Sequence, residues 1–170
     1  DGTALGTYMV LDLVPGSGSG APGGFTHTNN MLFFTAGPGS SLWRIDATTA
    51  GTFSIASFQL VSNLTGFNGN VYFSADINYS GQDLWKSNGT VAGTQLLKDL
   101  NGVFGASLPC NFHVTPNILY FMANTNEGWE LWKTTGSNAS TVQVKDINPG
   151  NAGGVLSVYS VANAGNIGNT

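Results

Sequence analysis

The sequence carries very little charge. Only 8% of its 170 residues are charged, against about 25% in a typical soluble domain. The formal net charge is −4, and the few basic residues are scattered over the whole length: Arg44, Lys86, Lys98, Lys133 and Lys145. So sparse a positive charge excludes nucleic acid and anionic membrane surfaces as main partners.

Cysteine and glutamate are almost absent. The single cysteine, Cys110, cannot form an internal disulfide, and we interpret it as a small buried hydrophobe. Only two glutamates occur, Glu127 and Glu130, and the aspartates recur mainly at repeat positions. Because no carboxylate pair, nucleophile or metal set stands out, we predict that the chain is not an enzyme and holds no cofactor.

Long apolar runs are also missing. The longest covers residues 118–123, far short of the roughly 20 residues that span a bilayer, so we expect no membrane span. The N-terminal DGTALGT has no signal-peptide pattern. Hydrophobic residues nevertheless make up 41% of the chain, including four Trp, five Tyr and ten Phe, which predicts a folded domain rather than disorder.

A Leu-Trp pair recurs three times, each time followed by a polar turn that ends in threonine. These segments align without gaps over residues 42–52, 84–94 and 131–141, and residues 1–7 match the end of a further copy. The repeat-defining positions are Leu42, Trp43, Leu84, Trp85, Leu131 and Trp132. The pattern predicts one repeat domain over residues 1–170, with units of approximately 1–45, 46–87, 88–134 and 135–170, the first and last incomplete.

Each unit contains several short segments typical of strands. One follows the turn, at residues 10–13, 55–58, 97–100 and 144–147. A second forms the later arm of a hairpin, at residues 32–36, 71–75 and 119–123, after the turns Asn29-Asn30, Asn68-Gly69 and Pro116-Asn117. Apolar residues occupy both alternating columns of these arms, so we expect both faces of the sheet to be covered.

These observations predict an all-β fold made of four-stranded antiparallel units, because no segment has a useful helical periodicity. Four short strands in about 45 residues are typical of a β-propeller blade. A β-solenoid and a stack of small sheets fit the same strand count and remain alternatives.

With the unit boundaries given above, the first and the last unit each lack some of their strands. The chain opens with the end of one unit and closes with a single expected strand at residues 155–161. Three full units are too few for a closed propeller, so either the first and last strands meet inside a distorted ring or another chain completes the open units. Unpaired strand edges invite pairing. We therefore expect copies of the chain to assemble by strand donation or edge pairing.

The repeat resembles the ELWxxDGT-repeat family of secreted and surface bacterial proteins. The motif is clearest in ELWKTTGS (residues 130–137) followed by VKDINPG (residues 144–150), and DLWKSNGT (residues 83–90) is nearly as close. The copies depart from it at the leading Glu, replaced by Ser41 and Asp83, and in the DGT triplet, intact only at Asp1-Gly2-Thr3. The resemblance implies an extracellular or cell-surface location and a structural or adhesive role, and it supplies no catalytic residues.

Turn formation and packing explain the motif without any ligand. An Asp or Asn followed by Gly-Thr favours a turn closed by side-chain hydrogen bonds to the backbone, and the tryptophan adds a large apolar group beside it. We interpret the Trp column as packing, with sugar-stacking aromatics as the alternative. Trp129 lies outside the repeat columns and is the better candidate for an exposed contact.

Four further patterns concern residues that can form binding or modification sites. His27 and His113 are offset by one repeat position, so we interpret them as isolated structural histidines. The glycine-serine run of residues 16–20 precedes no helix and is interpreted as a loop. Asp76, Asn78 and Ser80 place oxygen atoms at alternate positions before a glycine, which makes them calcium candidates, although the equivalent loops lack the pattern. Sequons at Asn63, Asn78, Asn88 and Asn138 permit glycosylation.

The sequence therefore predicts a non-enzymatic, extracellular structural or adhesive protein that binds copies of itself to form a filament or layer. The alternative is a glycan-binding propeller module that uses Trp129 or the Trp column as a stacking platform.

Overall fold

The computed structural model describes residues 2–37, 40–46, 48–102, 105–147 and 149. Within these residues the chain forms strands and loops without helices, which confirms the all-β prediction. Every strand is short, between four and eight residues. In chain order they are β1 (Gly23–Thr28), β2 (Met31–Ala36), β3 (Ser41–Ile45), β4 (Phe53–Ser57), β5 (Leu60–Phe67), β6 (Asn70–Asp76), β7 (Asp83–Ser87), β8 (Gln95–Lys98), β9 (Cys110–Val114), β10 (Leu119–Thr125), β11 (Gly128–Thr134) and β12 (Val142–Lys145).

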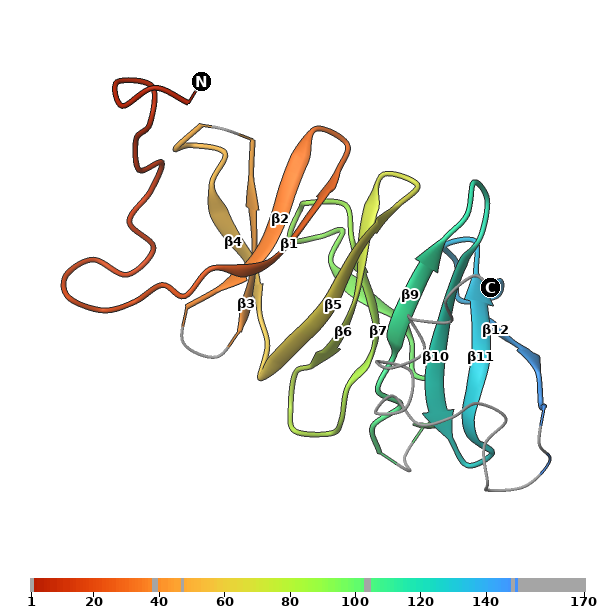
Figure 1. The fold of residues 1–170 in the computed structure, drawn as a ribbon. Helices are drawn as coiled ribbons and strands as arrows, with labels where there is room; N and C mark the ends of the chain where they lie inside the picture. The colour runs from red at the N-terminus through yellow and green to blue at the C-terminus, as the bar shows by residue number, and fades with distance from the viewer. Residues whose placement is uncertain (1, 38–39, 47, 103–104, 148, 150–170) are drawn as a thin grey trace, which may run out of the picture.

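The strands form three antiparallel sheets of four strands each: sheet 1 (β1–β4), sheet 2 (β5–β8) and sheet 3 (β9–β12). Each sheet is a meander in which every strand pairs with its neighbour in the chain. The sheets stand in a row, with the first strand of each beside the first strand of the next (Figure 1). This arrangement is consistent with propeller-like units or with a stack of small sheets.

The hairpin turns explain the register within each sheet. Asn29 and Asn30 both have positive φ, as do Asn68 and Gly69. Two consecutive residues of positive φ match the right-handed twist of the strands, and Asn and Gly tolerate this conformation best. The turns therefore fix Leu32 opposite His27 and Val71 opposite Gly66, which places equivalent residues of sheets 1 and 2 on equivalent faces.

Alternation along the strands sends one apolar column to the preceding sheet and one to the following sheet. Between sheets 1 and 2, Phe33 and Leu42 pack with Val71 and Phe73 in one buried cluster. Between sheets 2 and 3, a second cluster has the equivalent residues one sheet further on: Tyr72, Leu84, Leu119 and Phe121. Sheet 2 is thus buried on both faces, as the two apolar columns of its sequence predict.

The polar turn after each Leu-Trp strand is closed by the same hydrogen bonds in successive units. In the first, the Thr48 amide (3.1 Å) and hydroxyl (2.6 Å) donate to Asp46 Oδ1. The Thr48 hydroxyl accepts from the Gly51 amide at 2.9 Å, and the bonds from Thr48 lower the pKa of Asp46. Asn88, Thr90 and Gly93 repeat the arrangement.

The third copy reaches the same turn with a compensating pair of changes. Thr135 occupies the position of Asp46 and Asn88. Ser140 occupies the position of Gly51 and Gly93. The Ser140 hydroxyl accepts from the amides of Thr135 and Ser137, both at 3.1 Å. At the equivalent Gly93 a side chain would collide with Asn88, so the serine fits only where the longer Asp or Asn side chain is gone.

One expected strand is absent. Residues 10–13 were predicted to form a strand like residues 55–58, 97–100 and 144–147, but the structure has no strand there. The other three segments contribute to β4, β8 and β12, each paired with the Leu-Trp strand that precedes it. Among the described residues, no Leu-Trp strand pairs with residues 10–13. The strand predicted at residues 155–161 lies outside the described residues.

The turn hydrogen bonds can be tested with Thr90→Val, which keeps the side-chain shape and removes the hydroxyl. Because that hydroxyl both donates and accepts within the turn, its loss is expected to lower the free energy of unfolding by about 1–2 kcal/mol. Urea unfolding measures the effect as a lower midpoint at unchanged slope. The matched control is Val91→Ala in the same turn, where the side chain is exposed. Equal midpoints for the two variants would contradict this account.

Candidate functional site

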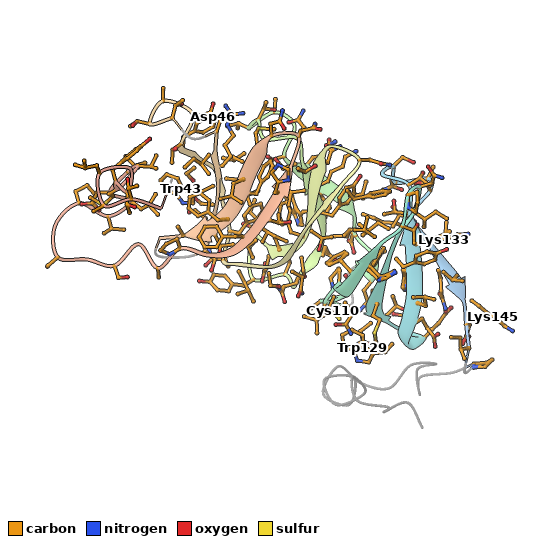
Figure 2. The ribbon with its side chains drawn as sticks, turned by 45° about the horizontal axis from the view of Figure 1, so that its top comes forward. Trp43, Asp46, Cys110, Trp129, Lys133 and Lys145 are labelled. Carbon is orange, nitrogen blue, oxygen red and sulfur yellow. The ribbon has the colours of Figure 1, made fainter. Side chains whose placement is uncertain are left out.

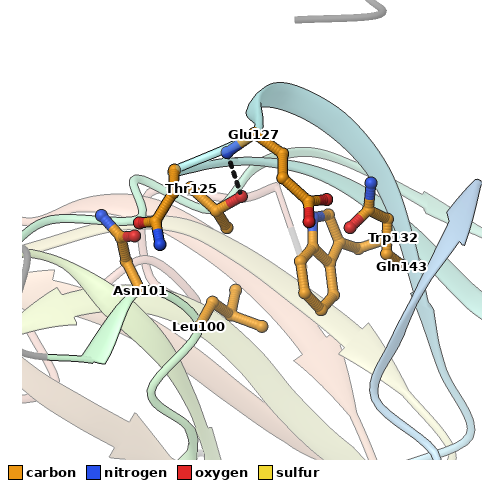
Figure 3. Close-up of a pocket in the computed structure, with 7 residues that line it drawn as sticks. Leu100, Asn101, Thr125, Glu127, Trp132 and Gln143 are labelled. Atoms are coloured by element: carbon orange, nitrogen blue, oxygen red, sulfur yellow. Dashed lines mark hydrogen bonds between the residues drawn. The ribbon is translucent and has the colours of Figure 1, made fainter. Parts of the chain in front are cut away.

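The residues at the edge of the contact between sheets 2 and 3 enclose a pocket of about 230 Å³ (Figure 3). The loop after β8, the β10–β11 turn, β11 and β12 contribute to it. Its lining residues are Leu100, Asn101, Thr125, Asn126, Glu127, Trp132 and Gln143. The pocket therefore draws on two sheets and forms only when they pack together.

The pocket follows from a difference between the two sheet contacts. In the first contact, the ring of Phe58 lies 5.1 Å from the ring of Trp85 in an edge-on arrangement. Leu100 and Trp132 occupy the equivalent repeat positions in the second contact, and the smaller leucine leaves space beside the indole. Trp132 is held from its other side by Phe121, whose ring centroid is 6.4 Å away.

Three buried polar atoms at this pocket have no hydrogen-bond partner. They are the indole nitrogen of Trp132, Oδ1 of Asn101 and Nε2 of Gln143. Glu127 extends from the β10–β11 turn toward the indole, and its backbone amide donates a hydrogen bond to the Thr125 hydroxyl at 3.3 Å (Figure 3). Buried polar atoms are nearly always paired in folded proteins, so this cluster of unpaired atoms marks a site that can bind a polar molecule.

The two outer sheets present a different kind of candidate surface, at opposite ends of the row. We call the face of sheet 1 that points away from sheet 2 the leading face; it includes Phe25, Phe34 and Trp43, and of these Phe34 is only 5% exposed. We call the free face of sheet 3 the trailing face; it includes Trp129 and Leu131, which alternate with the buried Glu130 along β11. In Figure 2, Trp43 lies in the left part of the molecule and Trp129 lies toward the lower right.

Residues of the N-terminal segment lie over part of the leading face. Val10, Leu11 and Leu13 line a pocket of about 180 Å³ together with Phe25 and Phe34, among other residues. A neighbouring pocket of about 280 Å³ includes Val10 and His27. These hollows show that the segment leaves part of the leading face unfilled.

The residue before each Leu-Trp pair forms a hydrogen bond with a residue in or after the outer strand of its sheet. Glu130 is fully buried, and its Oε2 accepts from the Ile147 amide at 3.3 Å. Asp83 accepts from the Ser107 hydroxyl at 2.7 Å, and burial raises its pKa, partly offset by that bond. In the first unit Ser41 shares a 3.1 Å hydroxyl contact with Ser57 instead.

The structure disperses the other residues singled out in the sequence. His27 pairs with Leu32 and His113 with Tyr120, so the two histidines face opposite sides of their sheets. Cys110 is half-buried and has no disulfide partner, and burial raises the pKa of its thiol. Asp76 Oδ1 accepts from the Asn78 amide at 3.1 Å.

Neither a metal cluster nor a membrane-spanning helix is found. Within residues 2–37, 40–46, 48–102, 105–147 and 149, no three His, Cys, Asp or Glu side chains gather closely enough to hold a metal ion. In that same part of the chain, no helix is long and apolar enough to cross a bilayer.

The sequons occupy different settings. Asn63 Nδ2 donates to the Pro109 carbonyl at 3.2 Å, and Asn138 Nδ2 donates to the Leu97 carbonyl at 3.0 Å. Both bonds connect neighbouring sheets, so a sugar attached to either nitrogen would compete with a structural contact. Asn78 and Asn88 are exposed.

The pocket was not among the sites predicted from the sequence. The sequence does contain a sign of it: the repeat alignment places the smaller Leu100 at the position that Phe58 occupies in the preceding unit. The comparisons add no relative: no protein-family model matches the chain, and no curated protein matches it significantly. The described residues thus form three four-stranded antiparallel sheets, with a polar pocket at the contact between sheets 2 and 3.

Asp83→Asn tests the role of the buried acid. Because the pKa of Asp83 is raised in the folded state, the folded chain binds this proton more tightly than the unfolded chain. Its contribution to stability is therefore greatest below the ordinary pKa of 3.8 and is lost as pH rises through the higher folded pKa.

Asparagine can still accept the Ser107 hydrogen bond but cannot ionise. The variant is expected to keep its stability as pH rises over this range, where the parent chain loses some. Thermal unfolding followed by circular dichroism between about pH 4 and pH 7 measures the difference. Asp12→Asn, at an exposed position outside the three sheets, is the control. Parallel pH profiles for the parent chain and Asp83→Asn would contradict the assignment.

Proposed function

We propose that this chain is a non-enzymatic, extracellular structural or adhesive module that assembles with copies of itself into a filament or layer. The proposal rests on a comparison of the leading and trailing faces with the faces that pack between the sheets. The residues on the leading and trailing faces occupy the same repeat positions as residues buried between the sheets.

The trailing face gives the clearest comparison. Ile55 and Leu97 are 3% and 4% exposed because the next sheet covers them, whereas the equivalent Val144 is 43% exposed. Leu42 and Leu84 are likewise fully buried, while the equivalent Leu131 is only half-buried. The trailing face thus has the residues that cover a following sheet elsewhere in the chain.

The leading face has the complementary residues. Leu64 and Phe112 pack against the two buried clusters, whereas Phe25, at the equivalent register position of β1, is 58% exposed. Phe34 and Trp43 stack in the same way as Phe121 and Trp132, with ring centroids 6.2 Å and 6.4 Å apart. The leading face of one copy therefore matches the trailing face of another.

A contact between two different faces is heterologous, so it can be repeated from copy to copy and yields either a ring or an open filament. Low surface charge favours such association, because little repulsion opposes it. Edge pairing or strand donation is the alternative contact. The edge strand β12 ends in a lysine, Lys145, and such a charge opposes pairing between edges.

The test uses two variants of the 170-residue chain, Phe25→Glu on the leading face and Val144→Glu on the trailing face. Each places one charge in a contact that should exclude water. Each variant alone is expected to remain monomeric at concentrations where the parent chain forms larger species, measured by analytical ultracentrifugation. Val91→Glu is the control, because Val91 is exposed in a turn away from both faces.

Mixing the two variants distinguishes the contact modes. The intact trailing face of Phe25→Glu can bind the intact leading face of Val144→Glu, so the equimolar mixture is expected to form a dimer and nothing larger. Assembly of each variant alone into the species formed by the parent chain would favour edge pairing. A parent chain that stays monomeric at every concentration would contradict self-assembly.

A further inference from the structure

We infer that the pocket between sheets 2 and 3 binds a neutral polyhydroxylated ligand, a single sugar residue of a glycan. This inference goes beyond the proposed structural role and rests on a different part of the molecule. It depends on the chemistry of the lining atoms and on the space that Leu100 leaves.

The lining combines donors and acceptors around one small volume. The Trp132 indole N–H and the Gln143 amide N–H groups are unpartnered donors, and Asn101 Oδ1 is an unpartnered acceptor. Trp132 is 8% exposed, so its N–H has lost almost all contact with bulk water. A ligand that pairs with these atoms recovers hydrogen bonds that the protein alone leaves unmade.

The same set of atoms argues against other ligand classes. A metal cation would meet the positive ends of two N–H donors, and an anion would meet the Glu127 carboxylate. A purely apolar ligand would leave the three buried polar atoms unpaired at a cost. A hydroxyl group both donates and accepts, so neighbouring hydroxyls on one ring can satisfy Asn101, Gln143 and Trp132 together.

Size and surroundings fit one ring rather than a longer chain inside the pocket. The volume of about 230 Å³ equals that of roughly eight water molecules at about 30 Å³ each. Leu100 and the indole edge of Trp132 supply apolar surface for the C–H face of a sugar (Figure 3). Further sugar residues would extend past the exposed Glu127 and Asn126 into solvent.

The experiment follows the four indole N–H signals of the ¹⁵N-labelled chain by NMR, with Trp132→Phe identifying the signal of Trp132. The probes are D-glucose, D-galactose and N-acetyl-D-glucosamine, each added to about 100 mM, roughly a hundredfold above a Kd of 1 mM. At least one sugar is expected to shift the Trp132 signal saturably while the other three signals stay in place.

Three variants test the pocket itself. Gln143→Ala and Asn101→Ala are each expected to weaken binding about fivefold or more, the effect of one lost hydrogen bond. Leu100→Phe fills the space as Phe58 does in the first contact, and is expected to abolish binding without loss of stability, since cavity filling commonly stabilises. Gln95→Ala and Trp129→Phe remove the same chemical groups outside the pocket and should leave binding unchanged.

Several results would overturn the inference. They are the absence of a saturable shift with all three sugars, equal binding by the parent chain and Leu100→Phe, and a Trp132 shift produced by calcium chloride instead of sugar. Unchanged positions of the remaining indole signals establish that each variant is folded. The Trp132 signal reports sugar binding whether or not the chain assembles. A negative sugar-binding result is therefore distinguishable from a negative result in the self-assembly test.

Discussion

The rest of the structure depends on the packing of one sheet face on the next. A four-stranded sheet with apolar residues on both faces is unstable in water, so each sheet needs a neighbour on both sides. Sheet 2 has two such neighbours within the chain, and its Phe73 and Tyr72 are buried on opposite sides. With so few charges, the molecule has little besides this burial and the hydrogen-bonded turns to stabilise it.

The turns serve the same packing. Lys86 Nζ donates to the Gly136 carbonyl at 2.8 Å, and Lys98 Nζ donates to the Thr141 carbonyl at 2.7 Å. Each bond runs from one sheet to the turn of the next. Two of the five basic residues are thus used in joining sheets, and one of them, Lys86, directly follows the Leu-Trp pair of its unit. The turn sets the distance at which the next sheet can approach.

Periodicity was enough to predict the all-β fold, the hairpin turns and the two apolar columns, because these features depend on local residue order. It failed at residues 10–13, since a strand needs a partner as well as a suitable sequence. The pocket escaped prediction for a related reason. It depends on Leu100 lying opposite Trp132 across two sheets, a contact that appears only when the sheets are assembled.

The proposed self-assembly and the proposed sugar binding both involve the repeat position of Leu100. In a contact between copies, Ile147 of one copy would take the place that Leu100 and Phe58 take within the chain, facing Trp43 of the next copy. The Trp43 indole nitrogen is also buried without a partner. An isoleucine is nearer in size to Leu100 than to Phe58, so a junction between copies would leave space beside the indole, as the second sheet contact does. Assembly would then repeat the sugar-binding geometry along the polymer, and linked sites bind a multivalent glycan more tightly than one site does.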